Sequence, residues 1–325
     1  MQITFAWEGA IALASSAEDG MYGSVRFLTF RVDESLCYPK YLVNYFKTPD
    51  GLQQIVKISP GSAGRNRVLS VKRIPEVLVP LPSLDEQHRL VARIEALATK
   101  IEEARGLRRL AVEGAEALLQ GALHQIFEIN SESWRQKSMA EAIAVNDRQV
   151  DPTLPQYSQL PHISGENIES KTCKLLPYQT AEQDGIKSGN YLFFPDTILY
   201  SKIRPYLQKA VYVDFKGVCS ADIYPIKVIH SELDQKFVMW SLVAGPFTEY
   251  ANRLSGRTRM PKLNRKQLFD FTLAHPPLEE QRHIVAYLDG LQAKVDALKA
   301  LQTQTQAELD ALLPSVLDRA FRGEL

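Results

Sequence analysis

Two stretches of the sequence concentrate positive charge without any acidic residue, and such stretches favour contact with a phosphate backbone. They are residues 61–73 and residues 251–266. The cations are Arg65, Arg67, Lys72 and Arg73 in the first, and Arg253, Arg257, Arg259, Lys262, Arg265 and Lys266 in the second. Glycine and polar neighbours indicate loops that can approach phosphates closely. The alternative is a solvated face whose charge is offset by acids nearby in space.

Residues 200–209 form a third candidate, in which cations alternate with tyrosines. Arginine can read guanine edges, and tyrosine rings can pack on sugars or bases. The same alternation fits an edge strand with exposed lysines. The residues concerned are Tyr200, Lys202, Arg204, Tyr206 and Lys209. The predicted DNA-binding set is Lys202, Arg204 and Tyr206 together with the cations of the first two stretches except Lys266. Residues 162–168 add weaker candidates for base contacts or a turn: His162, Ser164, Glu166 and Asn167.

The sequence carries few signs of catalysis. It contains no GxxxxGK[ST], GxGxxG, HExxH or GxSxG motif, and its six histidines are dispersed. One pattern, Asp196 followed by Asp214 and Lys216, resembles the PD…DxK arrangement in which two carboxylates hold Mg²⁺. Residues 214–217 also fit a hairpin turn. We therefore predict no catalytic residue, metal or cofactor, and keep a magnesium-dependent nuclease as an alternative.

The length and composition limit the classes of protein to which this chain can belong. The 325 residues suffice for two domains, and Lys+Arg and Asp+Glu both number 38, so any basic surface must be local. Three scattered cysteines without a CxxC motif fit a reducing compartment. We find neither a convincing signal peptide nor an apolar run long enough to span a membrane, so a cytoplasmic location is expected.

The most informative feature is a duplication. "PSLDEQHRLVARI" begins at Pro82 and "PPLEEQRHIVAYL" begins at Pro276, an offset of 194 residues that holds without a gap over a long stretch. Further upstream, residues 23–46 match residues 219–242 in pattern, and each reads as a strand, a turn and a helix. Residues 130–200 have no counterpart in the first copy. We therefore expect the first copy to lack its N-terminal section.

Apolar residues spaced alternately by three and four follow each LxEQ motif and predict two long helices, each about 65 Å. We expect them to pair as an antiparallel coiled coil. The predicted seam comprises Leu90, Ile94, Leu97, Ile101, Ala104, Ala111, Ala115 and Leu118 in the first helix, and Ile284, Leu288, Leu291, Val295, Leu298, Leu309, Leu312 and Val316 in the second. Polar seam residues Arg108, Gln302 and Thr305 should set the register. Pro314 should kink or break the second helix.

These residues support a family resemblance. The doubled LxEQ helix entry, with the upstream stretches "SAGRNRVLSVKRI" and "LSGRTRMPKLNRKQL", resembles the specificity subunit of type I restriction-modification systems. The resemblance covers about residues 20–325. It implies an α+β fold with two mixed α/β target-recognition domains, the first incomplete, joined by two long antiparallel helices. The implied bounds are 1–82 for the partial first recognition domain, 83–129 for the first long helix, 130–275 for the second recognition domain and 276–325 for the second long helix.

The resemblance also implies a function. Such a subunit has no catalytic centre; it reads a bipartite site on double-stranded DNA and positions methyltransferase (modification) subunits and a restriction subunit. Two other classes stay open from the residues alone. One is the Mg²⁺-dependent nuclease built on Asp196, Asp214 and Lys216, and the other is a coiled-coil scaffold whose basic loops are incidental.

Overall fold

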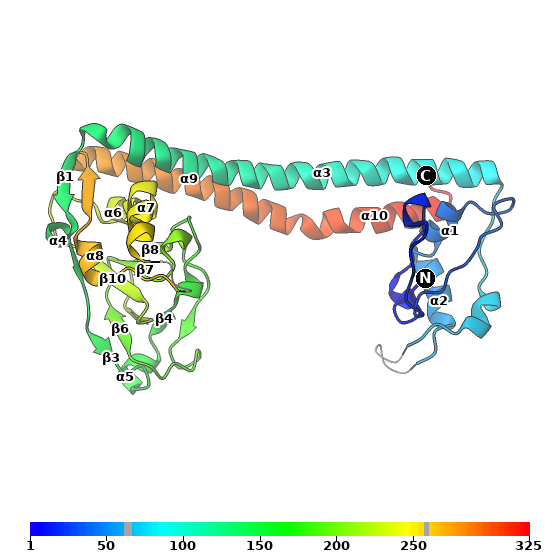
Figure 1. Cartoon of the computed structure of the whole chain (residues 1–325), viewed down its shortest axis with the longest axis horizontal. Helices are drawn as coiled ribbons and strands as arrows, with labels where there is room; N and C mark the ends of the chain where they lie inside the picture. The colour runs from blue at the N-terminus through cyan, green and yellow to red at the C-terminus, as the bar shows by residue number, and fades with distance from the viewer. Residues whose placement is uncertain (62–66, 257–259) are drawn as a thin grey trace. The chain divides into compact units, whose positions relative to one another are not determined.

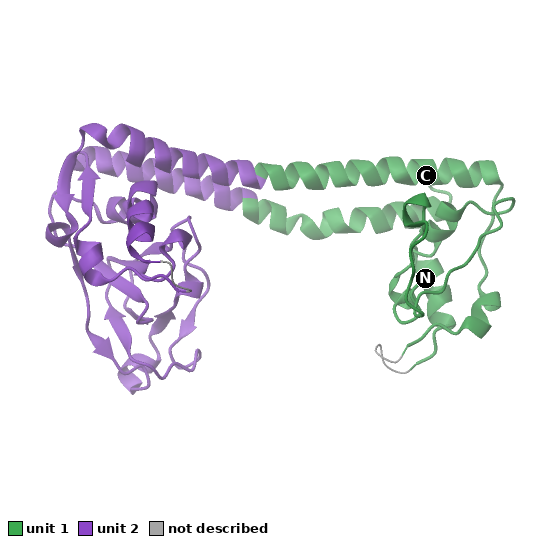
Figure 2. Cartoon of the chain, in the orientation of Figure 1, with its two compact units in different colours: residues 1–111, 299–325 green, residues 112–298 purple. Residues whose placement is uncertain are grey.

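The computed structural model describes residues 1–61, 67–256 and 260–325. The chain divides into two compact units (Figure 2). Unit 1 comprises residues 1–111 and 299–325, and unit 2 comprises residues 112–298. Unit 2 is therefore inserted, along the sequence, between the two parts of unit 1.

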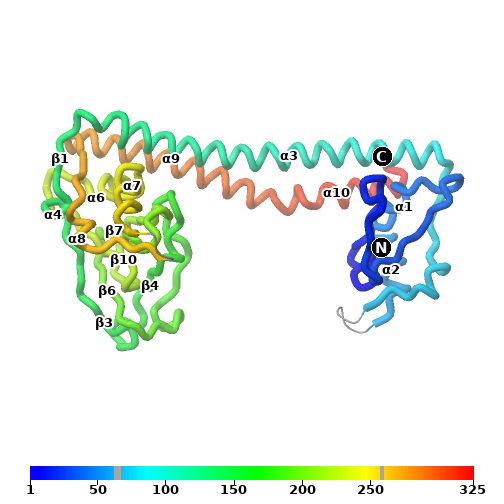
Figure 3. The backbone as a smooth tube through the Cα atoms, in the orientation of Figure 1, coloured from blue at the N-terminus to red at the C-terminus, as the bar shows by residue number. Residues whose placement is uncertain are grey.

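Long helices contain the repeated segments. α3 runs without interruption through Leu84–His124, and a π-helical segment, Gln125–Ile129, follows it. The second copy forms α9, Leu278–Gln304, and α10, Gln306–Phe321. Within unit 1, α10 runs alongside the first part of α3 (Figures 1 and 3). The two predicted long helical segments are confirmed, but the second is divided at Thr305.

In unit 1 the two helices pair in opposite directions. Val91, near the start of α3, shares a buried apolar cluster with Leu317, near the end of α10. Further along α3, the Arg105 guanidinium lies 3.0 Å from an Asp310 carboxylate oxygen. Because contacts move backward along α10 as they move forward along α3, the pairing is antiparallel, as the sequence predicts.

The polar seam residues meet in unit 1 and explain where the second helix is interrupted. Arg108 donates to the Thr305 hydroxyl at 2.8 Å and to the Gln302 carbonyl at 2.6 Å, and the Gln302 side chain donates to the Arg108 carbonyl at 2.8 Å. In a continuous helix that Gln302 carbonyl would accept from the amide of Gln306. A side-chain donor inserted into the helical ladder causes such interruptions. The prediction of a break at Pro314 is wrong, since this exposed proline lies inside α10.

The buried face of each long helix shifts by one residue from the predicted seam towards the end of the repeat. The predicted Leu118 is 66% exposed, whereas its neighbour Leu119 is 2% exposed. The same shift occurs in the second copy, where Leu312 is 46% exposed and Leu313 is partly buried. A 3.6-residue helix drifts against a seven-residue repeat, so the second leucine of each doublet turns inward. In unit 2, Leu119 belongs to the same buried cluster as Leu288 of α9.

The glutamine of the second LxEQ motif is buried in unit 2 and links two chain segments through its side-chain hydrogen bonds. We call this arrangement a glutamine bracket. Gln281 is 0% exposed. Its side-chain amide donates to the carbonyls of Glu232 and Pro276, both at 2.8 Å, and its side-chain oxygen accepts from the amide of Asp234 at 2.8 Å. The start of α9 is thereby attached to the N-terminus of α6, Gln235–Val243, which Asp234 caps.

Unit 1 contains the same bracket. Gln87 is also 0% exposed, and its amide donates to the carbonyls of Leu36 and Pro82 at 3.1 and 2.9 Å. Its oxygen accepts from the amide of Tyr38 at 2.8 Å, at the start of α1, Pro39–Tyr45. The repeated sequence therefore builds the same connection twice, from a glutamine to the N-terminus of an earlier helix, α1 in unit 1 and α6 in unit 2.

Over its described residues, unit 2 is a mixed α and β structure with three sheets. One has the strand order β2-β10-β7-β8 and is antiparallel, the second has the order β3-β6-β9-β4-β5, and β1 pairs with β11. The strands are β1 Arg135–Ser138, β2 Ile143–Val145, β3 Gln149–Val150, β4 Pro161–Ile163, β5 Gln179–Thr180, β6 Asn190–Phe193, β7 Thr197–Ser201, β8 Ala210–Val213, β9 Gly217–Cys219, β10 Ile223–Val228 and β11 Thr272–His275. The shorter helices are α4 Met139–Ala142, α5 Pro155–Ser158, α7 Gly245–Leu254 and α8 Arg265–Phe269.

The main core of unit 2 lies between the antiparallel sheet and helices α6 and α7. Trp240 and Phe237 of α6 share this cluster with Tyr200 of β7 and with Leu288 of α9. Residues 237–243 of α6 are all buried, as expected for a helix enclosed by a sheet and by other helices. The sheet and the long helices are thus held by one continuous core.

The globular part of unit 1 consists of short helices joined by long irregular segments. After α1, Thr48 caps α2, Pro49–Lys57, by accepting from the amide of Gly51 at 3.1 Å. Short 3₁₀ turns form at Ala6–Glu8, Ser16–Glu18 and Val71–Glu76. The strand predicted within residues 23–46 is wrong: Phe27 makes an isolated bridge to Gln2, and the described residues around it form no strand.

Candidate nucleic-acid interface

Two of the predicted basic segments lie side by side in unit 2. Just beyond β7, Ile203 bridges Lys262 in antiparallel fashion. Leu263 donates its amide to the Lys202 carbonyl at 2.9 Å, and Arg204 donates its amide to the Pro261 carbonyl at 2.8 Å. Residues 200–209 and the end of residues 251–266 therefore form one edge, although more than fifty positions separate them in the sequence.

A strained turn projects from this edge. Arg204 and Gln208 have φ values of 49° and 50°, in the left-handed region, and they flank a 3₁₀ turn at Pro205–Leu207. Such conformations cost about 1–3 kcal/mol and persist where surrounding contacts determine them. Here the Gln208 side chain donates to the Thr248 hydroxyl at 3.2 Å, and its carbonyl accepts from the Lys171 amide at 3.1 Å. The turn leaves the Arg204 and Tyr206 side chains exposed.

Beside the turn is a groove of about 550 Å³ in which two predicted motifs meet. Arg204 and Lys209 line it together with His162 and residues 164–167. The Lys209 ammonium donates to the Gly165 carbonyl, and the buried His162 ring lies 2.7 Å from an Asp184 carboxylate oxygen. The groove thus combines cationic donors with carboxylate acceptors, a mixture suited to base edges rather than to phosphates alone.

The weaker motif, residues 162–168, is largely structural. Asn167 accepts through its side-chain oxygen from the Ser164 amide at 2.8 Å and donates to the Pro177 carbonyl at 2.8 Å. Ser164 closes the same short turn by accepting from the Glu166 amide. Of these residues, Glu166 has an exposed side chain on the groove.

Several predicted cations already hold acidic partners. Lys262 lies 3.0 Å from Asp222, and Arg265 lies 2.9 Å from Asp147, whose pKa it lowers by a hydrogen bond. These pairs are largely exposed and worth little in stability, so a phosphate could replace the carboxylate at small cost. These two ion pairs fit the alternative reading of residues 251–266, a solvated face whose charge is offset by nearby acids.

In unit 1, Arg73 has a comparable partner. It donates to both carboxylate oxygens of Glu76 at distances of 2.8–3.1 Å. Arg67 lies over the Trp7 ring, 5.6 Å from its centroid. Lys72 is exposed and has no ion-pair partner within the described part of unit 1.

The remaining predicted cations differ in accessibility. Arg204 and Arg253 are exposed and make no ion pair with any residue that the structure describes. Lys202 instead donates to the Ala221 carbonyl at 2.5 Å and lies over the Tyr224 ring, and burial lowers its pKa. Arg65, Arg257 and Arg259 lie outside the described residues. Tyr200 is 1% exposed in the core, so its predicted exposure on this surface is wrong.

Comparison with known proteins identifies the family. The model of the type I restriction modification DNA specificity domain matches residues 123–309. The chain belongs to this family. It is 30% identical over 285 residues to the type I restriction enzyme EcoDI specificity subunit of Escherichia coli, and 21% identical over 321 residues to the StySPI specificity subunit of Salmonella potsdam. These alignments cover 78% and 90% of this chain but 63% and 66% of the relatives' lengths.

Solved structures agree with this assignment. The HsdS subunit from Thermoanaerobacter tengcongensis matches with a TM-score of 0.60, and a chain from a structural study of complex assembly in the type I restriction-modification system matches with a TM-score of 0.74. Both are 26% identical, and each match covers 97% of this chain and 78% of the other. The fold predicted for a type I specificity subunit is therefore confirmed.

The pattern that suggested a nuclease has a structural explanation in this specificity-family protein. Asp196, in the turn between β6 and β7, is ion-paired with Lys227. Asp214 and Lys216 lie in the connection between β8 and β9, which belong to different sheets, so the predicted hairpin is wrong. Among the described residues no group of three or more His, Cys, Asp or Glu could hold a metal ion. The comparisons give the nuclease alternative no support.

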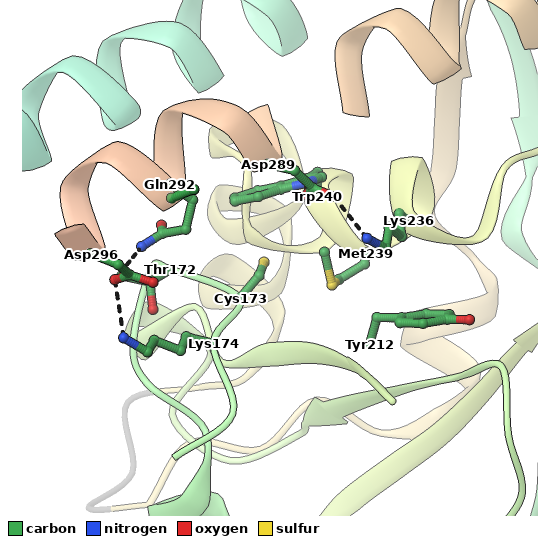
Figure 4. A pocket seen from close by; sticks show the side chains of 11 residues that line it. Thr172, Cys173, Lys174, Tyr212, Lys236, Met239, Trp240, Asp289, Gln292 and Asp296 are labelled. Carbon is green, nitrogen blue, oxygen red and sulfur yellow. Dashed lines mark hydrogen bonds and ion pairs between the residues drawn. The ribbon is translucent and has the colours of Figure 1, made fainter. Parts of the chain in front are cut away.

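A polar contact set that the sequence did not predict joins α9 to α6 and to the loop at Lys174 within unit 2 (Figure 4). Asp289 accepts from the Lys236 ammonium at 2.8 Å and from the Trp240 indole at 3.0 Å. One heptad later, Asp296 lies 3.2 Å from the Lys174 ammonium and accepts from the Gln292 side chain at 3.0 Å, beside a hollow of about 280 Å³. The sequence signal that could have revealed these contacts is the spacing of Asp289 and Asp296, which are seven residues apart and therefore lie on one face of the helix.

No helix in the described ranges combines the length and the apolar character that a bilayer crossing requires.

Proposed function

We propose that this chain acts as a non-catalytic DNA-recognition subunit of a type I restriction-modification system, and that unit 2 reads double-stranded DNA through the edge formed by residues 200–209 and 260–266. The observation that carries the proposal is the bridge between Ile203 and Lys262. It joins two separate basic segments beside a groove with both donors and acceptors. Membership of the specificity family supports the same role.

The residues on the edge suit different contacts. Arg204, exposed on the turn at Pro205–Leu207, can read a base edge, because its guanidinium can donate two hydrogen bonds to guanine. Lys262 and Arg265, whose exposed acidic partners can be exchanged, suit phosphates. Arg253 and Tyr206 extend the surface with exposed side chains. In unit 1, we assign a similar but smaller role to Lys72.

The other parts of the proposal follow the family. We assign residues 130–275 to a target-recognition domain, residues 1–82 to part of another, and residues 83–129 and 276–325 to the long helices. Methyltransferase and restriction subunits are the proposed partners, and a bipartite DNA site is the proposed target. A protein that reads chromosomal DNA works where that DNA is, so we propose a cytoplasmic location.

Salt-dependent binding tests this function. The purified chain, alone and assembled with methyltransferase subunits, is titrated against duplex DNA at several salt concentrations. Each phosphate contact should contribute about −0.9 to the slope of log K against log salt. Lys262→Ala and Arg265→Ala should each reduce the slope by about one, whereas Lys294→Ala, which removes an exposed lysine of α9, should leave it unchanged. Binding that is insensitive to salt, or absent in the assembled complex, refutes the proposal.

A further inference from the structure

The groove beside the Arg204 turn contains an acidic side chain to which the proposed function assigns no role. Two carboxylates line this groove, those of Glu166 and Asp184. The Asp184 carboxylate lies 2.7 Å from the buried His162 ring, which holds it in place. Glu166 is exposed and makes no ion pair with any residue that the structure describes. Its carboxylate therefore stays available in the groove as a hydrogen-bond acceptor.

The cations that line the groove do not neutralise this carboxylate. The Lys209 ammonium donates to the Gly165 carbonyl, within the turn that contains Glu166. The Arg204 side chain is exposed and, over the described ranges of the chain, has no ion-pair partner. Arg204 and Glu166 thus line one groove without pairing with each other, so each can meet a ligand group of its own.

Hydrogen bonds attach the turn that contains Glu166 to the turn that begins at Arg204. The 3₁₀ turn Gly165–Asn167 is closed at its N-terminus by a capping box. Further along the same segment, the Lys171 amide donates to the Gln208 carbonyl at 3.1 Å. Gln208 is the last residue of the strained turn that Arg204 begins. The fold therefore holds the two side chains at a set spacing, as a base-reading site requires.

An unpaired carboxylate opposes binding to the DNA backbone, because like charges repel at close range. It gains a hydrogen bond only from the amino groups of bases. Cytosine presents its N4 amino group in the major groove and no acceptor, whereas adenine presents the N7 acceptor beside its amino group. Opposite thymine or guanine oxygens, the carboxylate loses water without gaining a partner. A carboxylate in this groove therefore favours cytosine over the other three bases.

We propose that Glu166 is a specificity-determining residue, which accepts a hydrogen bond from the N4 amino group of a cytosine in the major groove. Because Glu166 and Arg204 line a single groove of about 550 Å³, this cytosine lies in or next to the base pair that Arg204 reads. The inference rests on the proposed function of unit 2 and adds to it a contact made by an acid rather than a cation.

The test selects duplexes from a random library with the full chain assembled with methyltransferase subunits. Affinity is then measured by fluorescence anisotropy for the enriched duplex with each of the four base pairs at every position. Glu166→Ala should reduce the preference for cytosine about 5- to 150-fold at one position, in or next to the pair at which Arg204→Ala acts. Because this variant removes a negative charge, it should bind unrelated duplexes about two- to fivefold more tightly.

Glu166→Gln separates hydrogen bonding from charge. Its side-chain oxygen can still accept from cytosine, but its amino group can also donate to N7 of adenine. The preference for cytosine over adenine should therefore narrow, while binding to unrelated duplexes tightens as in Glu166→Ala. Since the Glu166 side chain is exposed, neither variant should disturb folding.

The matched control is Glu132→Ala, which removes an exposed carboxylate of unit 2 from the turn Asn130–Ser133, outside the groove. It should change neither the enriched motif nor the affinity for unrelated duplexes. If Glu166→Ala binds all sequences more tightly but keeps the cytosine preference, the carboxylate only repels phosphates and the inference is wrong. A preference lost at a base other than cytosine, or far from the Arg204 position, also overturns it. If the unaltered chain enriches no motif, the proposed function fails as well, whereas a motif that Glu166→Ala leaves intact refutes this inference alone.

Discussion

Replacing the buried glutamine of the second repeat should destabilise unit 2 strongly. Gln281→Ala removes three hydrogen bonds of 2.8 Å, two to the carbonyls of Glu232 and Pro276 and one from the amide of Asp234. At about 1 kcal/mol net for each bond, the loss is about 3 kcal/mol, and leaving the Asp234 amide unpaired adds about 1–2 kcal/mol. We expect the free energy of unfolding of unit 2 to fall by about 4–5 kcal/mol.

This fall in the free energy of unfolding is measured by urea titration, with amide hydrogen exchange at α6 as the readout, since α6 begins at the bracket. His283→Ala, on the exposed side of the same helix turn, is the matched control and should change stability by less than about 0.5 kcal/mol. Gln87→Ala should produce the same loss in unit 1. If Gln281→Ala is as mild as His283→Ala, the bracket does not hold α9 to the N-terminus of α6.

Other perturbations test separate contacts. Arg108→Ala should lower the stability of unit 1 by about 2–3 kcal/mol in urea unfolding, because the charge-assisted bond to the Gln302 carbonyl is lost; a change under about 0.5 kcal/mol contradicts this. Tyr224→Phe should cost unit 2 about 1 kcal/mol through its 3.1 Å bond to the Leu263 carbonyl, with no effect expected if that bond is absent in solution. Burial lowers the pKa of Lys202, so its ammonium loses its proton earlier as pH rises, and DNA affinity measured by fluorescence anisotropy should fall at alkaline pH. Lys202→Arg should flatten that profile, and an identical profile in both proteins argues against a role for this charge.

The sequence was most informative where a signal was repeated. The doubled LxEQ motif predicted two equivalent helix entries, and the structure shows why glutamine stands there: its amide can both donate and accept inside each bracket. The long helices followed from apolar spacing. The spacing did not predict which leucine of each doublet is buried, because Leu118-Leu119 and Leu312-Leu313 allow two seams that differ by one residue.

Features that depend on long-range contacts could not be predicted in the same way. The division of the second helix arises where Arg108 reaches the Gln302 carbonyl, and composition pointed instead to Pro314. Likewise, the residues of the candidate interface were named from local charge. Their assembly depends on the bridge between Ile203 and Lys262, which a single sequence does not reveal.

Selection from a random duplex library most directly tests whether this edge reads DNA. The chain, assembled with methyltransferase subunits, is used to enrich bound duplexes at physiological salt, in parallel with Arg204→Ala and the control Lys294→Ala. We expect the unaltered chain and the Lys294→Ala control to enrich one shared motif, and Arg204→Ala to lose preference at one position within it, at a cost of about 1–3 kcal/mol for the preferred base. An enriched motif that Arg204→Ala leaves intact at every position, or no enriched motif for the unaltered chain, would contradict the account.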